Sequence, residues 1–169
     1  MTQYHGACDC GAVTFVCEGE PLFTQYCHCN KCRDISASSQ RDVDKIGYGF
    51  TAAYLRSHFK IASGDDRLDE VSKNGSNHLF CQSCHCLIYG ISLDPAKQAG
   101  IGINVNNFSF REKIPDTFKP VRHVWYTNRI IDFSDDLPKY KTAPKEQFGS
   151  GELYIESEED AKSAGPRVF

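Results

Sequence analysis

Three cysteines lie close together in the stretch around which the chain is organised, Tyr26-Cys27-His28-Cys29-Asn30-Lys31-Cys32-Arg33. Clustered thiols in a chain expected in a reducing compartment are typical of metal ligands. Cys32 follows Cys29 by three residues, a spacing that lets a tight turn fold the third sulfur back onto the first two. Three thiolates are one ligand short of a closed tetrahedral zinc site. The stretch therefore predicts zinc with an exchangeable coordination position.

Two further cysteine pairs supply the ligands for a closed site. Cys8 and Cys10 stand two residues apart, so in extended backbone both sulfurs would face the same way. Gly11 after them tolerates the positive φ that a ligand loop often needs. Cys81 and Cys84 form a CxxC pair of the knuckle type. These four thiolates predict a structural zinc that joins the N-terminal strand to a distant hairpin.

Composition and charge narrow the class of protein. With 169 residues, 40% of them hydrophobic and 24% charged, the chain has the size and composition of a single soluble domain. It contains no apolar run near the roughly 20 residues of a membrane helix and no signal segment at its N-terminus, so we expect a cytoplasmic protein with no membrane partner. A net charge of -3 disfavours nucleic acid as a partner. The sequence leaves open whether the protein forms a homo-oligomer.

Alternating apolar residues and turn signals predict a mainly β fold with few short helices. Strands are expected within residues 13–17, 22–26, 48–54, 59–64, 87–93, 101–105 and 121–126. Residues 68–71 and 78–80 should pair as a hairpin around the turn dipeptide Asn74-Gly75. Cys17 falls on an alternating apolar face and is expected in the core.

The remaining segments are polar or short. Helices are expected at Asp94–Ala99 and Ser157–Ala164, and a polar loop beside the three-cysteine stretch over Asp34–Lys45. Residues 1–143 should form the zinc-binding domain, and residues 144–169 a loosely packed, acidic C-terminal tail.

The missing fourth ligand of the three-cysteine stretch has two interpretations. His28, His85, Cys86 or another histidine would close a second structural site, whereas an exchangeable position, which we favour, would make the site catalytic. Zinc with three thiolates has a net charge of about -1, which weakens its power to acidify water. Such a metal suits a substrate thiol, which loses its proton on binding although a free thiol of pKa ~8.5 is mostly protonated. The chemistry predicted is that of a thiol-handling zinc enzyme.

Several motifs follow one another in a specific order over roughly residues 4 to 140. They are Gly6-Ala7-Cys8-x-Cys10-Gly11-Ala12-Val13, Cys27-His28-Cys29-x-x-Cys32-Arg33, Phe59-x-x-x-x-Gly64, Phe80-Cys81-x-x-Cys84, His123-x-Trp125 and Leu137-Pro138. This order resembles the glutathione-dependent formaldehyde-activating enzyme family, which includes the domain of centromere protein V.

The resemblance implies a β-tent fold of small antiparallel sheets clipped by zinc. It implies a structural zinc on Cys8, Cys10, Cys81 and Cys84, and a catalytic zinc, expected to be labile, on Cys27, Cys29 and Cys32. It also implies glutathione as the co-substrate and formaldehyde as the small electrophile. Their product is S-hydroxymethylglutathione, and the activity is formally that of a carbon-sulfur lyase.

The chain departs from the family pattern in two places. Where the family commonly continues the CxxC pair with Gly-Thr, this chain has His85-Cys86, and the segment Ile35–Ile46 is longer and more polar. The residues that flank the expected open site and that would bind glutathione carboxylates are Lys31, Arg33 and Arg41. A solvated surface explains these three charges nearly as well.

Some polar residues have competing interpretations. His28 should point away from the zinc, because chain neighbours alternate sides, and His123 is expected to be a hydrogen-bonded strand residue. The residues Asn104, Asn106 and Asn107 are either pocket donors or turn formers. At the level of the whole protein, the alternatives are a non-catalytic zinc-stabilised binding module and a zinc-thiolate enzyme for another small activated electrophile.

Overall fold

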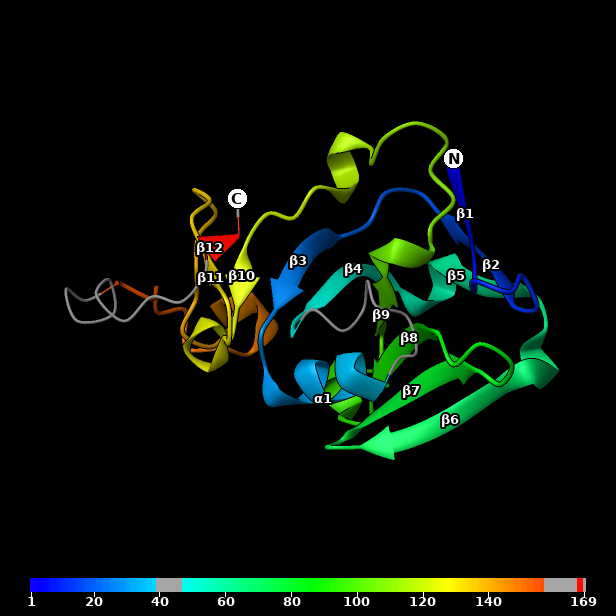
Figure 1. Ribbon diagram of the computed structural model, residues 1–169, viewed down its shortest axis with the longest axis horizontal. Helices are drawn as coiled ribbons and strands as arrows, with labels where there is room; N and C mark the ends of the chain where they lie inside the picture. The colour runs from blue at the N-terminus through cyan, green and yellow to red at the C-terminus, as the bar shows by residue number, and fades with distance from the viewer. Residues whose placement is uncertain (39–46, 157–166, 169) are drawn as a thin grey trace.

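The computed structural model describes residues 1–38, 47–156 and 167–168, and over these residues the chain is mainly β (Figure 1). The strands form a seven-stranded sheet, a three-stranded sheet and a two-stranded pair, and the described residues contain one α-helix. The predicted mainly β fold is confirmed. Within the described ranges, no helix is long and apolar enough to cross a membrane.

The large sheet has the strand order β10-β3-β4-β9-β8-β7-β6. Its strands are β3 (Phe23–Cys27), β4 (Gly49–Leu55), β6 (Leu68–Lys73), β7 (Ser76–Cys81), β8 (Leu87–Ser92), β9 (Gly100–Asn104) and β10 (His123–Val124). Neighbours are antiparallel, except that β10 runs parallel to β3. Asn74 and Gly75 both adopt positive φ between β6 and β7, so the predicted hairpin is confirmed.

The smaller sheet and the connections complete the fold. The three-stranded sheet has the order β1 (Gln3–Ala7), β2 (Thr14–Glu18), β5 (Phe59–Ser63), and β11 (Asp132–Phe133) pairs in parallel with β12 (Arg167–Val168). Single 3₁₀ turns are η2 (Arg56–His58), η3 (Asp65–Arg67), η4 (Pro95–Lys97), η5 (Val105–Asn107), η6 (Asp116–Phe118), η7 (Tyr126–Asn128) and η8 (Lys145–Gln147).

The hydrophobic core joins the two larger sheets. It contains Phe15 and Cys17 of β2, Tyr54 of β4, and Ile101 and Ile103 of β9, all of them buried. Cys17 is 0% exposed, which confirms its expected place in the core, and burial raises the pKa of its thiol to about 12. Since strand residues alternate sides, the chain neighbours of Tyr54 in β4 and of Ile101 and Ile103 in β9 face the other side of the large sheet.

The helix α1 (Asn30–Ser38) lies beside the large sheet, close to β7 in Figure 1. Lys31 donates a hydrogen bond to Ser76 Oγ of β7 at 2.9 Å, and Asp34 forms an ion pair with Lys73 of β6 at 3.3 Å. The expected polar loop is therefore wrong over residues 34–38, which are helical and bury Ile35. The rest of that segment, residues 39–45, lies outside the described residues.

Other expected elements are shorter than predicted. The strand expected over residues 121–126 is reduced to β10, because Trp125 adopts φ +56° and a 3₁₀ turn begins after it. The helix expected at Asp94–Ala99 is the single turn η4, where Asp94 Oδ1 accepts a hydrogen bond from the Ala96 N–H at 3.0 Å. Strand β1 was not expected, and the helix predicted at Ser157–Ala164 falls outside the described residues.

Part of the C-terminal segment contacts the β structure. The side chain of Gln147 donates to Gln25 Oε1 of β3 at 3.2 Å, and Tyr140 forms a β-bridge with Leu153. The division of the chain into a domain ending at residue 143 and an acidic tail stays a prediction.

Candidate metal centre

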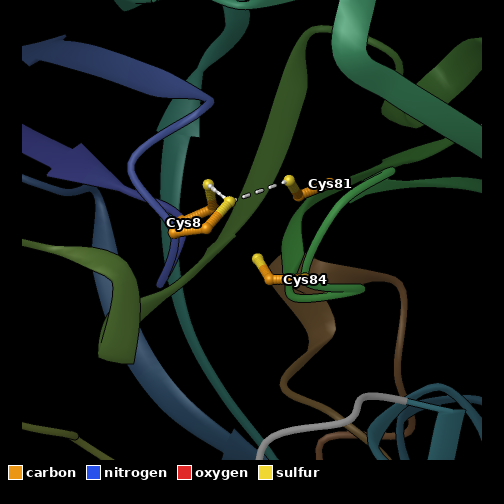
Figure 2. Close-up of side chains that lie close together, drawn as sticks. Cys8, Cys81 and Cys84 are labelled. Atoms are coloured by element: carbon orange, nitrogen blue, oxygen red, sulfur yellow. Dashed lines mark hydrogen bonds between the residues drawn. The ribbon is translucent and has the colours of Figure 1, made fainter.

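Four cysteine sulfurs meet at the junction of β1 and β7. Figure 2 shows the sulfurs of Cys8, Cys81 and Cys84 turned toward a common centre. Cys10 Sγ lies 3.4 Å from Cys8 Sγ and 3.7 Å from Cys81 Sγ, and all four sulfurs lie within 4.8 Å of one another. Because Cys10 and Cys81 are 71 residues apart in sequence, this four-cysteine group connects the N-terminal strand to the middle of the chain.

Two tight turns present these sulfurs. Cys8 and Cys10 lie in a turn closed by the hydrogen bond from the Gly11 N–H to the Cys8 carbonyl at 3.0 Å, and Gly11 adopts φ +72°. The sulfurs therefore meet through a turn and not through the strand alternation that we expected. Burial raises the pKa of the Cys8 thiol, and the hydrogen bond that the Val13 N–H donates to Cys8 Sγ at 3.2 Å opposes this shift by favouring the thiolate form.

The geometry of the four-cysteine group fits zinc. Four thiolates at the usual zinc–sulfur distance of about 2.3 Å occupy the corners of a tetrahedron whose edges are about 3.8 Å long. The sulfur–sulfur distances Cys8–Cys10, 3.4 Å, and Cys10–Cys81, 3.7 Å, are close to this edge, and every other pair lies within 4.8 Å. Cys8, Cys10, Cys81 and Cys84 would hold the ion.

The extra residues His85 and Cys86 belong to neither group of potential ligands among the described residues. Cys86 is 0% exposed, and its thiol lies 3.3 Å from Asn107 Oδ1, to which it donates a hydrogen bond. Asn107 in turn donates to the Leu87 carbonyl at 2.7 Å, so it fixes the backbone that follows the Cys81–Cys84 pair. His85 adopts φ +52° in the turn. Cys86 thus serves local packing next to the four-cysteine group, whereas the His85 side chain is exposed.

The three-cysteine group lies where β3 ends and α1 begins. The sulfurs of Cys27, Cys29 and Cys32 all lie within 4.8 Å of one another, with Cys27 Sγ and Cys29 Sγ 3.5 Å apart. Cys29 is the N-cap of α1: its carbonyl accepts from the Arg33 N–H at 3.1 Å, and its sulfur accepts from the Cys32 N–H at 3.3 Å. The third sulfur thus folds back through the first turn of a helix.

Charge in the three-cysteine group is concentrated on one sulfur. Hydrogen bonds from the thiols of Cys27 and Cys32 lower the pKa of Cys29 to about 3, with further contributions from the Cys32 N–H and the charge of Lys31. The same contacts raise the pKa of the Cys27 and Cys32 thiols. A thiolate at a helix N-terminus, with two further thiols beside it, is a suitable holder for a soft metal cation such as zinc.

A row of three hydrogen-bonded side chains supports the loop between Cys27 and Cys29. His28 Nε2 lies 2.9 Å from His123 Nδ1, and His123 Nε2 lies 2.9 Å from Asp135 Oδ2. Although burial favours the neutral carboxyl, hydrogen bonds from Lys139 and His123 lower the pKa of Asp135. Since a carboxylate only accepts, His123 Nε2 donates to Asp135, and His28 Nε2 donates to His123 Nδ1. His28 offers no ligand atom to either cysteine group, in agreement with the sequence.

A cavity of about 200 Å³ adjoins the three-cysteine group. It lies between α1 and strands of the large sheet, and its lining includes Cys32, Ile35, Ser36, His78, Gly90 and Gly102. Asn104 and Asn106 also line it, and Asn104 caps η5 by accepting from the Asn106 N–H at 3.1 Å. Ser36, His78 and the two glycines were not among the residues predicted for the site, although glycine inside a predicted strand is a signal of close approach by a ligand.

The three basic residues expected to bind glutathione differ in their surroundings. Lys31 points toward β7 and donates to Ser76. Arg33 Nη1 donates to the Asn128 carbonyl at 3.1 Å, so one of its N–H groups is already engaged within the protein. Arg41 lies outside the described residues. A role for these residues in binding stays a prediction.

Comparison with known proteins agrees with these observations. Among solved structures, the crystal structure of a Rhodobacter sphaeroides protein is similar with a TM-score of 0.52 and 20% identity, and the match covers 71% of this chain and 99% of that one. At this identity the likeness concerns the fold alone. None of the curated proteins compared matches the sequence significantly. The family model described as glutathione-dependent formaldehyde-activating enzyme matches residues 3–128, a span that contains both cysteine groups, and the chain therefore belongs to this family.

Proposed function

We propose that the chain is a zinc-dependent carbon-sulfur lyase that joins glutathione to formaldehyde and cleaves the adduct in the reverse direction. The observation that carries the proposal is the difference between the two cysteine groups, four sulfurs in one and three in the other. Zinc held by Cys27, Cys29 and Cys32 would have a free coordination position where a thiol loses its proton. The cavity beside Cys32 gives a small molecule room at that position.

The chain's own residues would orient the glutathione. Lys31 stands on the first turn of α1 and Arg33 just after it, on the same short element that carries Cys32. Their positive charges, with that of Arg41, are suited to the two carboxylates of the tripeptide, and an arginine can bind a carboxylate through two parallel hydrogen bonds. Such contacts would place the glutathione sulfur at the three-cysteine group. The cytosol, where glutathione keeps thiols reduced, is the compartment that we propose.

The test is exchange spectroscopy of formaldehyde with glutathione, with and without protein. Wild-type protein should accelerate the exchange, and Cys29→Ser should reduce the acceleration at least a hundredfold, because it removes a zinc ligand, whereas serine can still cap α1 by accepting from the Cys32 N–H. Cys86→Ser is the matched control: it also replaces a cysteine by serine, keeps a donor for Asn107 Oδ1, and lies outside both groups. Its rate should stay within twofold of wild type. An unchanged exchange rate with wild-type protein and full zinc content would refute the proposal.

A further inference from the structure

The cavity beside the three-cysteine group exists because two neighbouring strands carry glycine at the same point. Gly90 of β8 and Gly102 of β9 are paired in the sheet register. A Cβ at Gly90 would lie 3.0 Å from His78 Nδ1, and one at Gly102 would lie 3.0 Å from Thr51 Cγ2. Glycine weakens a strand interior and often marks a place where a ligand approaches. The paired glycines keep open a space that ordinary strand side chains would fill.

The lining of the cavity is apolar apart from a few polar atoms. Ile35, Phe50 and Ile91 supply hydrocarbon surface. Ser36 Oγ and His78 Nε2 are buried and, in the part of the chain that the structure describes, have no hydrogen-bond partner. Ser36 is 6% exposed and His78 is 8% exposed. Buried polar atoms are nearly always hydrogen-bonded, so these two indicate a ligand that brings a polar group into an otherwise apolar site.

The size of the cavity exceeds what formaldehyde needs. Formaldehyde has only two heavy atoms, whereas the cavity measures about 200 Å³. An apolar cavity of about 150 Å³ in another protein is large enough to bind benzene. Formaldehyde alone would leave most of the apolar lining without a contact.

Building on the function proposed above, we propose that this cavity binds the apolar substituent of an aldehyde larger than formaldehyde. The substrate class is then thiol adducts of aldehydes whose substituent has about four to seven carbon atoms, a size comparable to benzene. The thiol sulfur lies at the three-cysteine group beside Cys32, and the substituent lies over Gly90 and Gly102. Ser36 Oγ and His78 Nε2 bind the oxygen of the former carbonyl group.

The reaction needs no oxidant or reductant. The thiolate sulfur forms a bond to the carbonyl carbon, and the π electron pair of the C=O bond moves to the oxygen. That oxygen takes up a proton, so the proton lost by the thiol is balanced by the one gained by the new hydroxyl group. Cleavage of the adduct reverses each of these changes.

The cavity is tested by binding of stable adduct analogues, independently of any turnover. S-methyl-, S-butyl- and S-benzylglutathione are titrated calorimetrically into zinc-loaded protein. Each buried methylene group should strengthen binding about fourfold. Wild type should therefore bind the S-butyl compound at least tenfold more tightly than the S-methyl compound, and the S-benzyl compound at least as tightly as the S-butyl one.

Three variants of one strand, β9, show whether the cavity is responsible. Gly102→Val puts a side chain into the cavity and should reduce the preference for S-butyl over S-methyl to less than threefold, and Gly102→Ala should reduce it by a smaller factor. Gly100→Ala is the matched control on β9, because its Cβ would meet nothing closer than the Lys97 carbonyl at 3.7 Å. It should keep the wild-type preference.

The outcomes separate this inference from the proposed function. Equal affinity of wild type for S-methyl and S-butyl compounds overturns the larger-aldehyde class, even if formaldehyde exchange is accelerated. A preference that survives in Gly102→Val also overturns it, since the substituent then binds elsewhere. In a third outcome, Gly102→Val abolishes the preference for the S-butyl compound, but wild-type protein accelerates no aldehyde exchange. This outcome supports the cavity as the binding site of the substituent and refutes the proposed reaction.

Discussion

The four-cysteine and three-cysteine groups use the same ligand type in opposite ways. The first joins residues 71 positions apart and connects β1 to β7, whereas the second is contained within six residues at the end of β3 and the start of α1. A metal that closes a long loop removes much conformational freedom from the unfolded chain, and a metal that closes a short one removes little. The long-range group should therefore hold the fold together, and the local group should be free to serve chemistry.

The largest effect is expected from breaking the long-range group. Cys81→Ser removes a buried ligand and opens the connection between β1 and β7. By analogy with a covalent cross-link, closing a loop of about 70 residues is worth about 4 kcal/mol. For a chain of this size that corresponds to a fall in the melting temperature of roughly 8–16 °C. Thermal unfolding followed by circular dichroism measures it, and a change below about 3 °C would show that this group does not hold the fold.

A smaller effect on stability, with a clear effect on metal content, is expected at the local group. Cys32→Ser leaves the four-cysteine group intact, so the zinc content should fall from two ions per chain to one while the melting temperature changes by less than about 3 °C. Elemental analysis and thermal unfolding are measured on the same sample. Loss of both ions, or a melting temperature as low as that of Cys81→Ser, would show that the two groups are not independent.

The smallest effect on metal binding is expected from a change in the side chains that support the local group. Asp135→Asn weakens the acceptor that orients His123, which lies entirely buried against His28. Imperfect pairing of a buried polar group costs about 1–3 kcal/mol, and we expect a fall in the melting temperature of about 2–12 °C. A chelator should also remove the first zinc faster than from wild type, because the loop between Cys27 and Cys29 is held less firmly. Asp136→Asn, a neighbouring exposed carboxylate, is the control and should change neither quantity.

Much of the fold followed from local patterns. The alternation in β4 and β9, the Asn74-Gly75 hairpin and the buried Cys17 were predicted because each depends on residues a few positions apart. The helix α1 was missed because the polar sequence after Cys32 has little apolar periodicity. Its start depends on the Cys29 sulfur acting as the N-cap, a role that thiols rarely have.

By itself the sequence determined the two sets of potential metal ligands, because ligand spacing is a local property and cysteine chemistry allows few alternatives. Only the tertiary structure decided what surrounds them. The contact of His28 with His123 joins residues 95 positions apart, and the cavity arises where glycines of two strands meet beneath a helix. Long-range pairing is set by the burial of the whole core, so no local pattern around Tyr26–Arg33 reveals the cavity next to it.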